Sequence, residues 1–142
     1  MKALIAILVG AAIYVVVALH VAGPIQAQLA TGSHPVTLSA VTNSVLALSP
    51  NNTRGGALMQ FYCSNANATA FIELFDATNT AAVTLGTTVP VWAAQIQANT
   101  QVSFQLPIGG VQFGQGIMVA ASNAFNGSGA PGGNLSCAAA YY

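Results

Sequence analysis

The chain has 142 residues, of which 54% are hydrophobic and 3% are charged, and its formal net charge is zero. That length suits one domain with a core of its own. The only basic residues are Lys2 and Arg54, too few for the phosphate contacts that hold a protein on DNA or RNA, so nucleic acid is excluded as a partner. Solubility must come from Asn, Gln, Ser and Thr, which is typical of an extracellular or virion protein.

The N-terminal region carries an uncharged apolar run. It begins after Lys2 and extends over residues 3–22, close to the roughly 20 residues that span a bilayer core. We therefore expect one N-terminal apolar helix in residues 1–27, acting as a membrane anchor that contacts lipid. The alternative is a cleaved secretory signal, for which the positive start and "GPIQA" before Gln28 are suitable. The run is longer than the roughly 7 to 15 residues usual for a signal core, which favours the anchor.

Residues 28–35, "QLATGSHP", have the small, polar and helix-breaking composition of a linker, so the domain boundary is expected here. The globular domain then covers residues 36–142, outside the cytoplasm. His20 and His34 have no second ligand at a suitable spacing, and no metal site is expected.

From residue 36 onward, short runs rich in Val, Thr, Phe and Tyr alternate with Gly, Asn and Pro, a rhythm that predicts an all-β fold. We expect an antiparallel β-sandwich or jelly-roll-like domain of about eight strands. The predicted strands cover residues 36–41, 44–49, 57–63, 70–76, 89–97, 101–106, 116–122 and 134–142. In "QVSFQL", Val102, Phe104 and Leu106 should face the core, while the Gln and Ser side chains face water.

The stretch "FIELFDATN", residues 71–79, holds both acidic residues of the chain, Glu73 and Asp76. On a strand they point to opposite faces of the sheet, so they cannot act together on one substrate as in a glycosidase. Asp76 is expected to accept a hydrogen bond from the backbone of its own turn. Glu73 is expected to pair with Arg54 or to stay exposed.

Other motifs that carry chemistry are lacking in the sequence. No Ser lies in G-x-S-x-G and no glycine loop ends in G-K-[ST]. The loop "GSGAPGG", residues 127–133, has no following Lys or helix and is expected to be a flexible connector. We expect no catalytic residue, no cofactor and no small-molecule substrate, and therefore no enzyme.

Cys63 and Cys137 are the only cysteines, each near the end of a predicted strand. An even count in an exported chain suggests a disulfide, worth roughly 4 to 5 kcal/mol on the chain-entropy model. The alternative is two buried thiols. A nucleophilic cysteine is disfavoured because neither has a basic or His neighbour in the sequence.

Several segments together resemble the small β-sandwich proteins encoded among bacteriophage virion genes: "FIELFDATN", "GTTVPVWAAQIQANTQVSFQL", "GVQFGQGIMVAAS" and the last strand with Tyr141 and Tyr142. The resemblance covers residues 56–142 and implies a decoration, spike or capsid-associated role without catalytic residues. The apolar N-terminus, the two cysteines and the scarcity of charge depart from that pattern. An anchor would suit a virion that contains a lipid membrane.

Three functions follow as expectations. The first is a structural subunit that assembles with copies of itself and with other virion proteins. The second is a subunit of a pilin-like extracellular filament. The third is a secreted module that binds carbohydrate through Trp92, Tyr62 or the C-terminal tyrosines, although the apolar neighbours of Trp92 favour core packing.

Overall fold

A computed structural model describes residues 34–48 and 56–142. The expected anchor or signal in residues 1–27 lies outside the described residues, as do Arg54 and most of the expected linker. Within the described ranges, the structure contains no helix that is long and apolar enough to cross a membrane.

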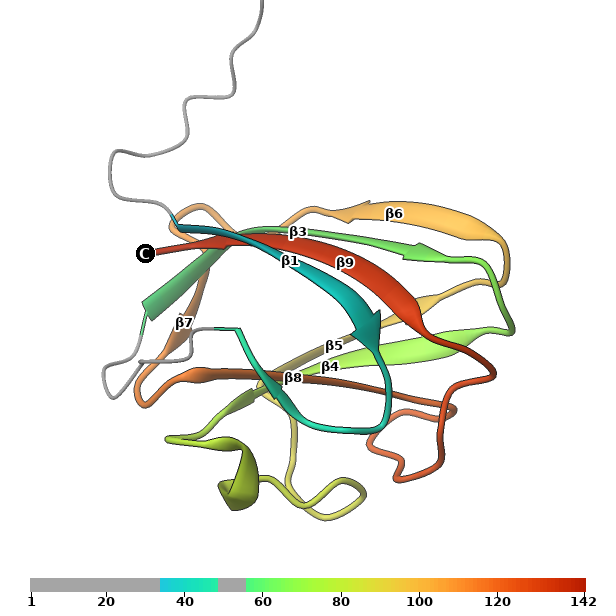
Figure 1. Cartoon of the computed structure of the whole chain (residues 1–142). Helices are drawn as coiled ribbons and strands as arrows, with labels where there is room; N and C mark the ends of the chain where they lie inside the picture. Colours follow the sequence, from blue (N-terminus) through green and yellow to red (C-terminus); the bar gives the residue numbers. More distant parts are fainter. Residues whose placement is uncertain (1–33, 49–55) are drawn as a thin grey trace, which may run out of the picture. The chain divides into compact units, whose positions relative to one another are not determined.

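The domain consists of two antiparallel sheets packed face to face, which Figure 1 shows as an upper and a lower layer. The first sheet has the order β1-β9-β3-β6, with β7 also paired to β3, and the second has the order β2-β8-β4-β5. The strands of the first sheet are β1 (His34–Val41), β3 (Gly56–Asn65), β6 (Thr100–Phe104), β7 (Val111–Phe113) and β9 (Leu135–Tyr141). Those of the second are β2 (Leu46–Ala47), β4 (Ala70–Asp76), β5 (Trp92–Ile96) and β8 (Ile117–Ser122).

The expected all-β, two-sheet sandwich is confirmed, and each of the eight predicted runs contains a strand. The strand β4 has the predicted bounds, whereas β1 begins at His34 and so includes two residues expected in the linker. The short strand β7 was not predicted; its three residues lie between glycines, in the segment between the predicted runs 101–106 and 116–122.

Most connections carry the chain from one sheet to the other. Among the described strands, only the β4–β5 and β6–β7 connections join strands of the same sheet. As a result β9, the last strand, lies between β1 and β3, and β8 lies between β2 and β4. Most neighbouring strands are therefore far apart in sequence, and the core is built mainly from long-range contacts.

The space between the sheets holds the main core, to which β6 contributes as predicted. Val102 and Phe104 pack against this core, while Gln101 and Ser103 are exposed. Trp92 is half-buried and meets Phe104 edge to face, with ring centroids 5.0 Å apart. The expectation that Trp92 packs in the core is thus confirmed.

A second apolar cluster covers the outer face of the second sheet. Phe75, Met118 and Ala120 point away from the main core and pack with Val83 of the β4–β5 connection, residues 77–91. This connection includes the 3-10 helix η1 (Thr80–Ala82) and lies below the lower layer in Figure 1. It therefore shields from water an apolar face that would otherwise be exposed.

Candidate functional site

The Glu73 carboxyl is buried on the outer face of the second sheet. Its neighbours across the ladder are Ala93 and Ala120, whose small side chains leave room above the sheet. The side chain is 0% exposed, and its Oε1 atom accepts a hydrogen bond from the backbone N–H of Asn126. The expectation that Glu73 stays exposed is wrong, because the β8–β9 loop, residues 123–134, folds over it.

The conformation of the β8–β9 loop directs backbone N–H groups towards the Glu73 carboxyl. Asn126 has a φ of 49°, in the left-handed region that asparagine adopts more readily than most residues. The Ser122 hydroxyl lies 3.3 Å from Oε1 of Glu73 and donates to the Ala124 carbonyl at 2.6 Å. The Glu73 side chain thus ties the β8–β9 loop, which contains the expected flexible connector of residues 127–133, to a strand 53 residues earlier in the chain.

Burial raises the pKa of Glu73 and outweighs the hydrogen bonds from Asn126, Ser122 and Gly127, which act to lower it. Two buried oxygens, Oε2 of Glu73 and Oδ1 of Asn126, have no hydrogen-bond partner within the described residues. Both are acceptors when the carboxyl is ionised. A proton on Oε2 converts that oxygen into a donor, so the site favours a neutral carboxylic acid.

Asp76 lies at the end of β4 and holds the connection between β7 and β8. Its carboxylate accepts backbone N–H groups from Gly114 at 2.9 Å, Gln115 at 2.7 Å and Gly116 at 3.2 Å. Burial acts to raise the pKa of Asp76, but these three N–H groups together lower it below its ordinary value. As expected, Asp76 accepts hydrogen bonds from backbone N–H groups. The expected donors in its own turn are wrong, because the observed donors belong to a turn nearly 40 residues away.

The two carboxylates share no hydrogen-bond partner, since a different loop holds each of them. Within the described ranges, no group of three or more His, Cys, Asp or Glu side chains is arranged to hold a metal ion. The geometry supports a structural role for both: Glu73 fastens the β8–β9 loop, and Asp76 fastens the turn between the sheets.

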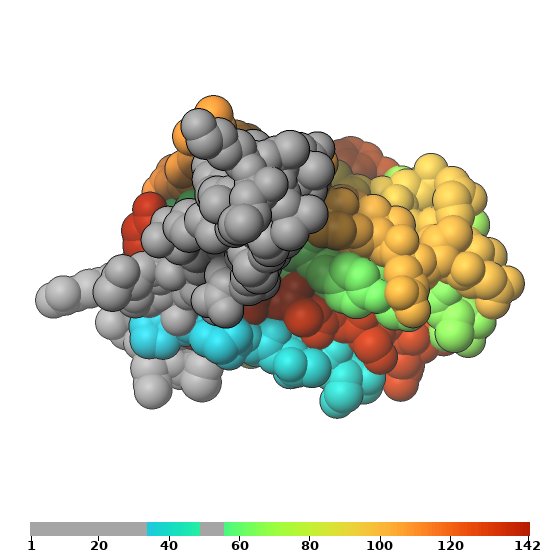
Figure 2. Space-filling model, turned by 90° about the horizontal axis from the view of Figure 1, so that it is seen from above, coloured from blue at the N-terminus to red at the C-terminus, as the bar shows by residue number. Residues whose placement is uncertain are grey.

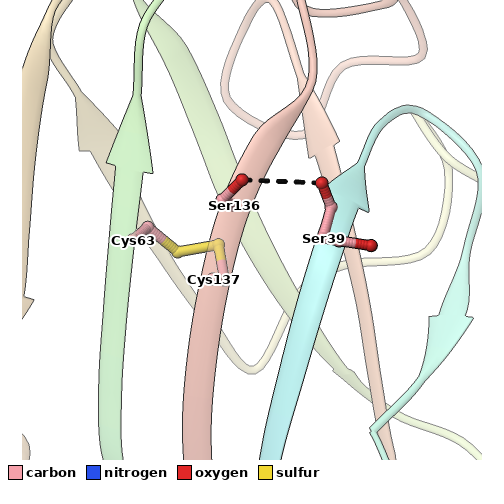
Figure 3. The surroundings of a disulfide bond; sticks show 4 residues. All are labelled: Ser39, Cys63, Ser136 and Cys137. Atoms are coloured by element: carbon pink, nitrogen blue, oxygen red, sulfur yellow. Dashed lines mark hydrogen bonds between the residues drawn. A yellow bond between two sulfur atoms is a disulfide. The ribbon is translucent and has the colours of Figure 1, made fainter.

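The predicted Cys63–Cys137 disulfide is confirmed (Figure 3). The cysteines lie directly opposite each other on β3 and β9, with Cα atoms 4.1 Å apart. The preceding residue of β9, Ser136, donates its hydroxyl to the Ser39 carbonyl of β1 at 3.5 Å. The bond closes a sequence separation of 74 residues and indicates an oxidising, non-cytoplasmic location.

The outer face of the first sheet carries small, uncharged side chains around one aromatic residue. A row across the four strands consists of Thr37, Ala138, Tyr62 and Ser103, in register. Figure 2 looks onto this layer and shows β1 in cyan, β9 in red, β3 in green and β6 in orange side by side. Tyr62 is 38% exposed.

The exterior of the described domain is almost free of charge. The described residues include only two charged side chains, Glu73 and Asp76, of which the first is fully buried and the second is bound by backbone N–H groups. The sequence shows that charge is scarce, but it gave no signal that both carboxylates are held by loops. The residues that hold them are distant in sequence and have no spacing motif that links them: Gly114, Gln115 and Gly116 for Asp76, and Ser122 and Asn126 for Glu73.

No protein-family model, curated protein or solved structure matches this chain.

Proposed function

We propose that the chain is a non-enzymatic structural subunit, a membrane-anchored or exported β-sandwich that assembles in a virion. The strand orders β1-β9-β3-β6 and β2-β8-β4-β5 support this proposal. Interleaved sheets of this kind, linked by connections that pass from one sheet to the other, are typical of the jelly roll. Viral capsid proteins are among the proteins that use that architecture.

The observation that carries the proposal is the lack of free charge on the exterior of the described domain. Proteins with a net charge far from zero repel their own copies and remain monomeric. Here the Glu73 carboxyl is buried, and the Asp76 carboxylate, although ionised, is held by backbone N–H groups of its own chain. Hydroxyl, amide and small apolar surfaces of separate copies can therefore pack closely with little like-charge repulsion.

The described residues also offer little to an enzymatic mechanism. Acid–base or covalent catalysis needs neighbouring groups whose pKa values are tuned for proton transfer. Glu73 has no titratable hydrogen-bond partner in the described ranges, and both cysteines are bonded to each other. A structural role accounts for Glu73 and the two cysteines without assuming a substrate or a reaction.

Electron microscopy of the assembly in its native source tests the proposal. The expected result is a closed shell or a particle-bound spike that contains this chain, with the domain on the outer side of a lipid layer. A helical fibre would support the filament subunit instead. A monodisperse monomer with measurable turnover would overturn the assembly proposal.

A further inference from the structure

A shallow polar cleft lies at one end of the first sheet, where the β3–β4 and β5–β6 turns meet. Its volume is about 240 Å³. Its lining consists of amide, hydroxyl and methyl groups, contributed by Ser64, Asn65, Ala66, Asn99, Thr100 and Gln101. None of these residues is charged. In Figure 2 the two turns lie at the right-hand end, where green and orange segments adjoin.

The floor of the cleft is held by one buried amide. Asn65 is 1% exposed, and its Nδ2 group donates to the carbonyls of Ala68 at 2.9 Å, Ile96 at 3.3 Å and Gln97 at 3.3 Å. Its Oδ1 accepts the backbone N–H of Asn67 at 2.9 Å. Both turns are thereby fixed to the same side chain, so the cleft keeps its shape without a ligand.

The polar groups at the rim remain available to a ligand. The side chains of Ser64, Asn99 and Gln101 make no hydrogen bond to any other described residue, and Asn99 and Gln101 are exposed. Hydroxyl and amide groups both donate and accept hydrogen bonds. These rim groups suit a ligand that carries hydrogen-bond donors and acceptors side by side. They offer no counter-ion to a charged ligand.

An aromatic side chain stands beside the cleft on the same face. Tyr62 precedes Ser64 by two residues on β3, a separation of roughly 7 Å along a strand. The residues opposite them on β6 are Ser103 and Gln101. A tyrosine ring gives a rigid apolar surface with a polar tip, and combined with Ser, Asn and Gln it forms a surface suited to recognition.

The disulfide stiffens this part of the sheet. Cys63 lies between Tyr62 and Ser64. Its side chain faces the core, where it forms the disulfide with Cys137 of the neighbouring strand β9. The aromatic ring and the polar rim are therefore carried by a strand that cannot slide against its neighbour. Such preorganisation lowers the entropy lost on binding.

We propose that the cleft and Tyr62 form a binding site for a neutral oligosaccharide. A sugar ring has an apolar C–H face, which would lie on the Tyr62 ring, and a rim of hydroxyl groups, which would exchange hydrogen bonds with Ser64, Asn99 and Gln101. The cleft admits a single sugar ring of a longer glycan. This site adds a ligand to the proposed assembly role and does not depend on it.

The test uses the full chain in a polyoxyethylene detergent, because glucoside and maltoside detergents are themselves sugars. It would be applied to an array of neutral and acidic glycans, and the best neutral ligand would then be titrated by calorimetry. We expect selective binding of neutral glycans, weakened about tenfold or more by Tyr62→Ala, and a clear loss with Gln101→Ala.

Tyr142→Ala is the matched control, since Tyr142 is also an exposed tyrosine, at 53%, but follows β9 rather than lining the cleft. It should leave the affinity unchanged. Each variant must retain the disulfide and the wild-type melting temperature, and Asn99→Gly provides a second cleft variant that suits the φ of 57° at that position. Binding of no neutral glycan, preference for acidic glycans, or equal affinity in the cleft variants and the wild type would each overturn the site.

Discussion

Burial of the Glu73 carboxyl links the stability of the domain to pH. Below about pH 4.5, the ordinary pKa of this group, the carboxyl is neutral in both the folded and the unfolded chain. Above that value the unfolded chain ionises, whereas burial raises the pKa in the folded state and keeps the proton bound. The free energy of unfolding should therefore fall as pH rises from about 4.5 through the folded pKa.

Glu73→Gln removes this titration while keeping the shape of the side chain. We expect the variant to lose the decline in stability above pH 4.5 and to be at least as stable as the wild type at pH 7, because no buried group then resists ionisation. Melting temperatures measured across pH 4 to 8 provide the check. Gln95→Glu, which adds an exposed carboxyl to β5 of the same sheet, should not create such a decline. Parallel pH profiles for Glu73→Gln and the wild type would contradict the argument.

Asp76 acts in the opposite direction. Its pKa is lowered in the folded state, so its contribution to stability is present above its ordinary pKa of 3.8 and is lost as pH falls through the folded pKa. Asp76→Asn replaces one of two accepting oxygens by an NH₂ group that faces backbone donors. We expect a loss of about 1 to 3 kcal/mol at pH 7, measured by urea unfolding. A loss below about 0.5 kcal/mol, as for an ordinary surface substitution, would show that the three N–H groups are satisfied by water instead.

At the level of secondary-structure elements, local patterns predicted the strands but not the loops that pack over them. The alternation in β6 specifies both the strand and its core-facing side, because side-chain direction has a period of two residues, and the apolar run of β4 specifies a strand buried on both faces. The strand β7 has three residues between glycines, too few for a pattern, and pairs only because β3 extends beyond β6. The burial of Glu73 depends on the β8–β9 loop, whose contact with β4 no local signal reveals.

The same contrast applies to the candidate site. The exposure of Tyr62 follows from the alternation in β3, and Tyr62 is one of the sugar contacts expected from the sequence. The cleft beside it arises where two turns more than 30 residues apart meet, pinned by the Asn65 amide. Turn residues of this kind are common in any β protein, so their convergence becomes visible only in three dimensions.

The disulfide joins β3 and β9, the two central strands of the first sheet. Replacing both cysteines, Cys63→Ala with Cys137→Ala, should lower the free energy of unfolding by roughly 4 kcal/mol, because the unfolded chain regains the freedom of a 74-residue separation. Urea unfolding of the wild type with and without reductant should show the same difference, while reductant should not affect the double variant. Non-reducing peptide mapping should find the two cysteine peptides linked. Two freely alkylatable thiols in the oxidised native protein would contradict the bond.

For the whole molecule, a nearly uncharged exterior makes self-association sensitive to any added charge. Thr37, Thr78 and Ala130 are exposed on β1, on the β4–β5 connection and on the β8–β9 loop, so they sample three separate parts of the surface. A lysine at a position that contacts another copy would bring like charges together in a dry interface. Lysine at a position that faces solvent would change little.

We therefore expect at least one of Thr37→Lys, Thr78→Lys and Ala130→Lys to reduce incorporation into the assembly severalfold while leaving the melting temperature within a few degrees. Sedimentation and electron microscopy of co-expressed wild-type and variant chains would measure incorporation. Glutamine at the same positions is the matched control, because it is of similar length but neutral and should be tolerated better. Raising the salt concentration should partly restore a lysine variant, since screening shortens the range of the repulsion. If all three lysine variants were incorporated as well as the wild type, close packing of uncharged surfaces would not be what holds the copies together.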